Sequence, residues 1–104
     1  MQVVFREDRL ARIDAERTFT GGYPSAVVSA YRGRIQVLRA APREQAMLPL
    51  KSLRMERHGN GMSQHSLRVT DGWDLIVGFE DGDGGRVAVV EAMVNRTKTS
   101  MEQP

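Results

Sequence analysis

An Asp-Gly dipeptide between two alternating segments constrains the fold of this chain more than any other feature. Residues 64–69 alternate between two strand faces, and Trp73, Leu75, Val77 and Phe79 take every second position of residues 73–79, as in a β-strand with one buried face. Asp71-Gly72 lies between them and favours a tight hairpin turn. A glycine-rich turn at residues 81–85 then leads into a last strand at residues 86–93. The second half of the chain is therefore predicted to form a three-stranded antiparallel meander.

The first half of the chain carries a helical pattern instead. One long helix is predicted to begin at Pro24 and to end before Pro42. Its apolar stripe recurs every three or four residues and consists of Val27, Tyr31, Ile35 and Leu38. A shorter helix is predicted over residues 9–16 with Asp8 as its N-cap, after a short strand at residues 3–5.

These elements predict one α+β domain over residues 1–104, in which an N-terminal strand and helices pack on a C-terminal antiparallel β-meander. Residues 94–104 are expected to be a flexible tail. The length is that of one ordinary domain, which can bury a small core without disulfides.

The composition narrows the possible chemistry. Cysteine is absent, which excludes disulfides, thiolate catalysis and cysteine-bound metals. The two histidines, His58 and His65, are too few for a dedicated metal site without nearby acids. No apolar run is long enough to span a bilayer, and residues 1–14 lack the apolar core of a signal peptide. We therefore expect a cytoplasmic protein with no metal, no cofactor and no membrane contact.

Positive charge is concentrated in the middle of the chain. Residues 32–68 hold eight basic and two acidic side chains, a net charge of 8 − 2 = +6. Residues 71–91 hold one basic and six acidic side chains, a net charge of 1 − 6 = −5. The basic stretch can be an ordinary solvated surface, a polyanion-binding face or a docking face for an acidic protein.

Several of these residues suit RNA binding and RNA cleavage. Metal-free cleavage needs a base for the 2′-hydroxyl, cations for the pentavalent phosphate and an acid for the leaving oxygen. The candidate RNA-binding residues are Arg43, Lys51, Arg54, Arg57, Asn60 and Gln64. The candidate catalytic residues are His58, His65, Arg68 and Arg96. His65 shares a strand face with Leu67 and Val69, which favours a structural role, whereas His58 is either a catalytic group or an idle surface histidine.

An ordered series of short motifs resembles the HigB-like branch of the RelE/ParE toxins. Its segments are Tyr23-Pro24, Ala30-Tyr31-Arg32, Ala40-Ala41-Pro42, Leu50-Lys51-Ser52-Leu53, Gly59-Asn60, Gln64-His65-Ser66-Leu67-Arg68-Val69, Trp73-Asp74-Leu75 and Phe79-Glu80. The resemblance implies helices on a small antiparallel sheet, a helix-turn-helix, HigA-like antitoxin as partner, and mRNA cleavage on the translating ribosome. The ParE relatives inhibit DNA gyrase instead, and fold alone does not choose between these targets.

The chain departs from the family pattern at the positions that carry chemistry. Gly61 and Asp74 stand where the family has arginines, and Val94-Asn95-Arg96 stands where the ribonucleases have Asp-Tyr-His. Arg96 can still stabilise charge. The leading hypothesis is a ribosome-dependent mRNA endonuclease that inhibits translation. The alternatives are a diverged toxin that binds RNA or the ribosome without cleavage, and a ParE-like gyrase inhibitor.

Overall fold

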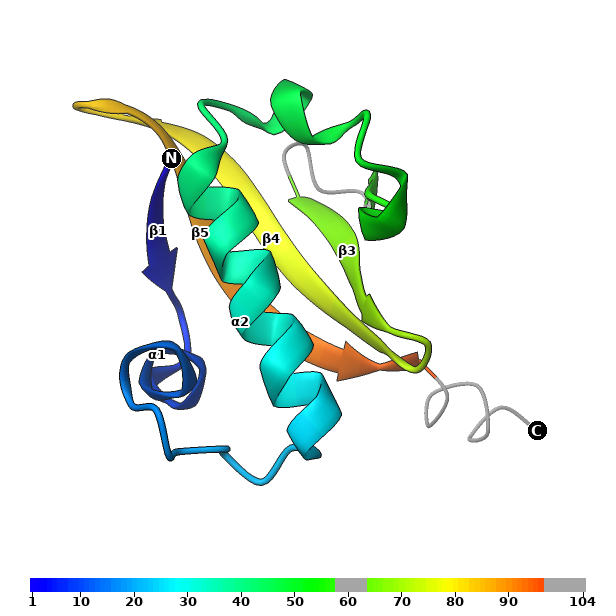
Figure 1. The fold of residues 1–104 in the computed structure, drawn as a ribbon. Helices are drawn as coiled ribbons and strands as arrows, with labels where there is room; N and C mark the ends of the chain where they lie inside the picture. The colour runs from blue at the N-terminus through cyan, green and yellow to red at the C-terminus, as the bar shows by residue number, and fades with distance from the viewer. Residues whose placement is uncertain (58–63, 97–104) are drawn as a thin grey trace.

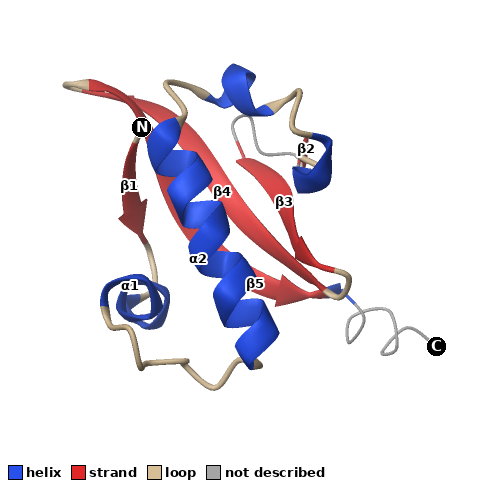
Figure 2. Cartoon of the chain, in the orientation of Figure 1, coloured by secondary structure: helices blue, strands red, loops and turns tan. Residues whose placement is uncertain are grey.

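A computed structural model describes residues 1–57 and 64–96 of the chain. Its main elements are β1 (Gln2–Phe5), α1 (Asp8–Ala15), α2 (Ser25–Ala40), β2 (Glu56–Arg57), β3 (Gln64–Thr70), β4 (Trp73–Gly82) and β5 (Gly85–Asn95). Two short 3-10 helices, η1 (Glu44–Met47) and η2 (Lys51–Leu53), lie between α2 and β2. The helix α2 crosses one face of the sheet, so helices and strands form two layers (Figures 1 and 2). The predicted α+β class is confirmed.

The strands of the described residues form one mixed sheet in the order β1-β5-β4-β3-β2. β3, β4 and β5 make the predicted antiparallel meander. β1 pairs in parallel with β5, from Gln2 opposite Val87 to Phe5 opposite Val90, and β2 adds two residues to the other edge. The prediction of a three-stranded sheet left out both edge strands. The pairing of β1 was missed because a parallel pair joined by a long crossover leaves no local sequence signal.

The hairpin between β3 and β4 contains a β-bulge. Arg68 pairs with Asp74 and Thr70 pairs with Trp73, so Val69 has no partner across the ladder. This bulge allows Leu67, Val69 and Leu75 all to be buried in the core. Arg68 and Asp74 consequently lie opposite each other on the face of the sheet away from α2.

The last strand is longer than the sequence indicated. β5 continues to Asn95, which pairs with Trp73, and the Arg96 N–H donates to the Gly72 carbonyl at 2.8 Å. The prediction of a flexible tail from residue 94 was therefore wrong for residues 94–96. They continue the ladder because the first residues of β4 need partners for their backbone groups. Residues 97–104 lie outside the described residues.

The helix α2 buries the predicted apolar stripe against the sheet. Tyr31, Ile35 and Leu38 are fully buried, and each large apolar side chain of this kind contributes roughly 1.5–3 kcal/mol to folding. The Tyr31 hydroxyl donates to the Leu10 carbonyl of α1 at 2.8 Å, and burial raises the pKa of Tyr31. Pro24 precedes the helix rather than starting it, since its ψ of 149° is extended.

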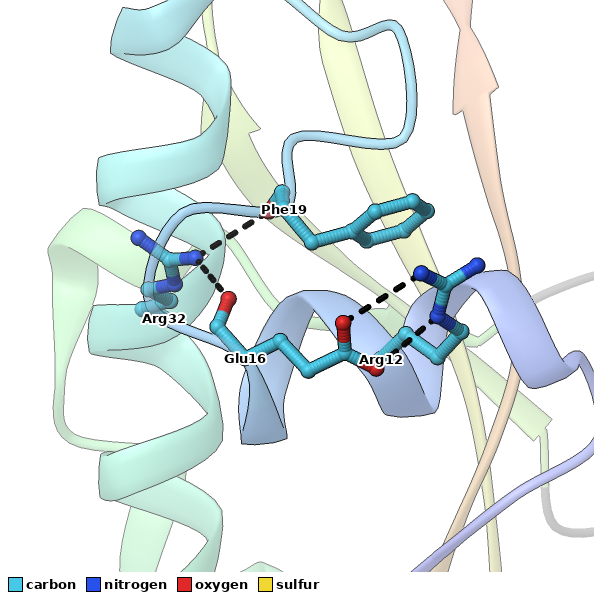
Figure 3. A network of polar contacts seen from close by, with 4 residues as sticks. All are labelled: Arg12, Glu16, Phe19 and Arg32. Carbon is cyan, nitrogen blue, oxygen red and sulfur yellow. Dashed lines mark hydrogen bonds and ion pairs between the residues drawn. The ribbon is translucent and has the colours of Figure 1, made fainter.

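Arg32, on α2, holds the segment that follows α1 against α2 by hydrogen bonds (Figure 3). Its guanidinium donates to the carbonyls of Ile13, Glu16, Arg17 and Phe19 at 2.8–3.2 Å. Beside it, the Arg12 guanidinium pairs with the Glu16 carboxylate and lies 3.9 Å from the centre of the Phe19 ring. A charged donor thus satisfies carbonyls that the end of α1 leaves without helical partners.

Candidate nucleic-acid interface

Four of the predicted RNA-binding residues lie on one segment that joins α2 to β3. We call residues 43–57 the basic segment; it carries η1 and η2 and runs past the start of β3 (Figure 1). Its basic residues are Arg43, Lys51, Arg54 and Arg57, and all four are exposed. None of the four forms an ion pair or a side-chain hydrogen bond with another described residue. Their charges are therefore available to a polyanionic partner.

The other basic residues of the +6 stretch have structural partners. Besides Arg32, the Arg34 Nε donates to the Arg68 carbonyl at 2.8 Å, and Arg39 forms a two-bond pair with the Asp14 carboxylate at 2.6 and 3.0 Å. These contacts hold α2 to β3 and to α1. The charge count along the sequence consequently overstates how much positive charge is free for a ligand.

Arg54 has an unusual backbone conformation. Its φ of 43° and ψ of 50° lie in the left-handed region, and it is the one non-glycine residue with positive φ among those described. This conformation is disfavoured for a residue with a Cβ. Strained residues of this kind gather at functional sites, so the conformation is a reason to test Arg54 for function.

Glu44, one of two acids in the basic segment, is paired with a cation from the sheet. Its carboxylate oxygens accept from Arg86 at 2.6 and 2.9 Å. This hydrogen bonding lowers the pKa of Glu44 below its ordinary value of 4.5. The pair ties η1 to the start of β5 and reduces the effect of Glu44 on the charge of the basic segment.

Arg68 and Arg96, both predicted to be catalytic, come together around one carboxylate. Arg68 Nε lies 3.6 Å from Asp74 Oδ1, and Arg96 Nε lies 3.1 Å from Asp74 Oδ2. We call Arg68, Asp74 and Arg96 the Arg-Asp-Arg triad. Neither Nε makes a hydrogen bond of good geometry among the described residues, although both atoms are buried, and the Arg96 guanidinium also donates to the Asp71 carbonyl. The exposed fractions of the three side chains, in order, are 23%, 13% and 36%.

The predicted catalytic histidine on β3 does not join this triad. The His65 ring packs edge-on against Phe79, with 5.5 Å between ring centres, on the face of the sheet that carries the core. Arg68 points to the opposite face. The structure therefore separates His65 from both arginines, whereas Gln64, also predicted for binding, shares the face of Arg68. His58 and Asn60 lie outside the described residues.

Comparisons with known proteins do not place this chain in a family. No protein-family model matches the chain. No curated protein matches it either. Within residues 1–57 and 64–96, no group of three or more histidines, cysteines and acids is arranged to hold a metal ion. In the same part of the chain, no helix has both the length and the apolar character needed to cross a membrane.

Proposed function

We propose that this chain is a cytoplasmic, RelE/ParE-like toxin of the HigB branch that binds ribosomal RNA and mRNA through the basic segment and the Arg-Asp-Arg triad. The ordered motifs in the sequence support the family. The four exposed cations of the basic segment, which have no side-chain partner within residues 1–57 and 64–96, are the single structural observation that carries RNA binding. A helix-turn-helix antitoxin of the HigA type would be its neutralising partner.

The geometry favours binding over cleavage. Two arginines at one carboxylate can stabilise a phosphate, but cleavage also needs a proton acceptor and a proton donor. His65 packs against the core, and Asp74 is shared by both arginines. A toxin of this form would inhibit translation by occupying RNA on the ribosome.

The endonuclease remains the second candidate, and the paired arginines are the observation that favours it. A cleavage reaction would take its proton chemistry from His58 or from a group that the ribosome supplies. The gyrase inhibitor is the third hypothesis, which rests on the sequence resemblance alone.

Salt-dependent binding tests the RNA-binding proposal directly. Fluorescence anisotropy with a labelled single-stranded RNA should give an affinity that falls with salt. Removal of one cation that binds a phosphate should reduce the log–log slope by about 0.7. Arg43→Ala and Lys51→Ala should each have this effect. Arg17→Ala is the matched control, because Arg17 is exposed on the loop after α1 and its side chain has no partner among the described residues.

Growth and cleavage assays then separate the candidates. Induced expression should inhibit bacterial growth, and the neighbouring antitoxin should relieve it. Ribosome-dependent primer extension should show no new cleavage end. Specific cleavage ends would establish the endonuclease, and a salt-independent affinity would remove RNA as the partner of the basic segment.

A further inference from the structure

A surface pocket of about 450 Å³ lies where the loop before α2 meets the ends of β4 and β5. Arg9, Gly21, Tyr23, Trp73, Met93 and Asn95 are among its lining residues. Pockets that bind small molecules commonly have volumes of about 300–1,000 Å³. No residue of the basic segment or of the triad lines it, so it is a separate feature of the surface.

The pocket presents aromatic rings beside a cation. Tyr23 and Trp73 form an edge-to-face pair with 5.2 Å between ring centres and 86° between ring planes. Both side chains are only partly buried. The Arg9 guanidinium lies 4.8 Å from the centre of the Tyr23 ring and donates to the Tyr23 hydroxyl at 2.9 Å. About half of the Arg9 side chain is exposed, and its Nε also lies 3.7 Å from an exposed Glu7 carboxylate oxygen outside the pocket lining.

The local backbone is shaped to keep this arrangement. Gly21 has a φ of 63°, and a Cβ there would lie 3.0 Å from Arg9 Cγ and 3.0 Å from Ile13 Cδ1. The Gly21 carbonyl in turn accepts from Arg9 at 3.4 Å. A residue with a side chain at position 21 would be strained and would displace Arg9, so the glycine sets where the cation lies.

The pocket also adjoins the triad across the end of the sheet. Trp73 and Asn95 pair with each other across the β4–β5 ladder, and each is followed in sequence by a triad residue. Successive side chains of a strand point to opposite faces. The rings therefore lie on the helix side of the sheet end and the triad on the other, one residue apart along both strands.

We propose that this pocket binds one nucleobase, with its phosphate at Arg9, and that it holds a base of the single-stranded RNA whose neighbouring phosphates contact the triad. The ligand class follows from its lining, because single-stranded nucleic acid is held by ring stacking combined with positive charge. No acidic side chain lines the pocket among the described residues. The placement of the base in RNA rests on the proposed function.

Trp73 provides a direct probe, since it is the only tryptophan of the chain. Titration of the full protein with UMP and with AMP should quench Trp73 fluorescence, and ribose 5-phosphate, which lacks the base, should not. A tetranucleotide should quench at lower concentration than either mononucleotide. Equal responses to ribose 5-phosphate and UMP, or no response to any nucleotide, would overturn the pocket.

Two variants locate the site. Tyr23→Ala should weaken UMP binding by about 5- to 150-fold, the range expected when one base no longer stacks on an aromatic ring. Tyr23→Phe keeps the ring but loses the hydroxyl that accepts from Arg9, so it should bind UMP less tightly than the parent and more tightly than Tyr23→Ala. Unchanged UMP affinity in a folded Tyr23→Ala protein would exclude the pocket as the binding site.

Failure of the pocket and failure of the proposed function give different results. Arg54→Ala should weaken binding of the tetranucleotide and leave quenching by UMP unchanged. Salt-dependent RNA binding without nucleotide quenching would retain the proposed function and overturn the pocket. Quenching by UMP without any RNA binding at the basic segment would support the nucleobase pocket and overturn the proposed function.

Discussion

Arg54→Gly should stabilise this protein while weakening its binding to RNA. The left-handed backbone of Arg54 costs a residue with a Cβ about 1–2 kcal/mol relative to glycine. Glycine loses about 0.4–1 kcal/mol through the greater entropy of the unfolded chain. The difference favours the variant by about 0.5–1 kcal/mol, or roughly 2–8 °C in Tm. The exposed side chain has no partner among the described residues, so no interaction there offsets this gain.

The binding effect follows from the charge that is removed. One phosphate contact fewer should lower the log–log salt slope by about 0.7 and weaken binding about 5-fold at about 0.1 M salt. Thermal melts and RNA anisotropy on the same samples measure both effects. Arg54→Ala is the control: it removes the same charge but keeps the unfavourable φ, so binding should fall without a gain in Tm. A lower Tm for Arg54→Gly, or unchanged RNA affinity, would refute the assignment of Arg54 as a strained binding residue.

Three further substitutions test other contacts. Asp74→Asn should tighten RNA binding about 5-fold at about 0.1 M salt, because it frees one cation of the triad. Weaker binding in the anisotropy assay would mean instead that the carboxylate orients the arginines. Arg32→Ala should lower stability by about 1.5–3 kcal/mol in urea unfolding, since it deletes a charged donor to four carbonyls, with the RNA salt slope unchanged. Arg86 lowers the pKa of Glu44, so their pair stabilises the fold above pH 4.5, and this stability disappears as pH falls through the lower folded pKa. Thermal melts from about pH 7 to about pH 3 should therefore show a steeper loss of stability in acid for the parent than for Glu44→Gln. Identical profiles of the two proteins would contradict this.

The sequence predicted those parts of the fold that depend on near neighbours. The helical stripe containing Tyr31 and Ile35 and the turn at Asp71-Gly72 were confirmed, because periodicity and turn chemistry are local properties. The parallel pairing of β1 with β5 was missed because its partners are distant in sequence. The extension of β5 was missed because Asn95 and Arg96 are polar and close to the chain end, whereas Val94 and Asn95 pair with the start of β4.

The candidate site was predicted less completely than the fold. A two-residue turn without a bulge pairs Arg68 with Leu75 and would place the arginine on the buried face. The bulge at Val69 corrects this and brings Arg68 opposite Asp74. The apolar pattern thus contained a signal for the triad that the strand prediction did not use. The strain at Arg54 had no such signal, because backbone dihedrals outside glycine positions follow from tertiary packing.

The parallel edge strand has a consequence for how the protein acquires its structure during synthesis. β1 leaves the ribosome first, yet its hydrogen-bonding partner β5 is the last strand of the sheet to emerge. Synthesis proceeds at about 5–20 residues per second, so β1 has no strand partner for most of that time. The β4–β5 ladder that joins Trp73 to Asn95 also cannot form until β5 emerges. Under the proposed function, this order of events would keep the nascent chain from assembling its RNA-binding surface on the ribosome that is making it.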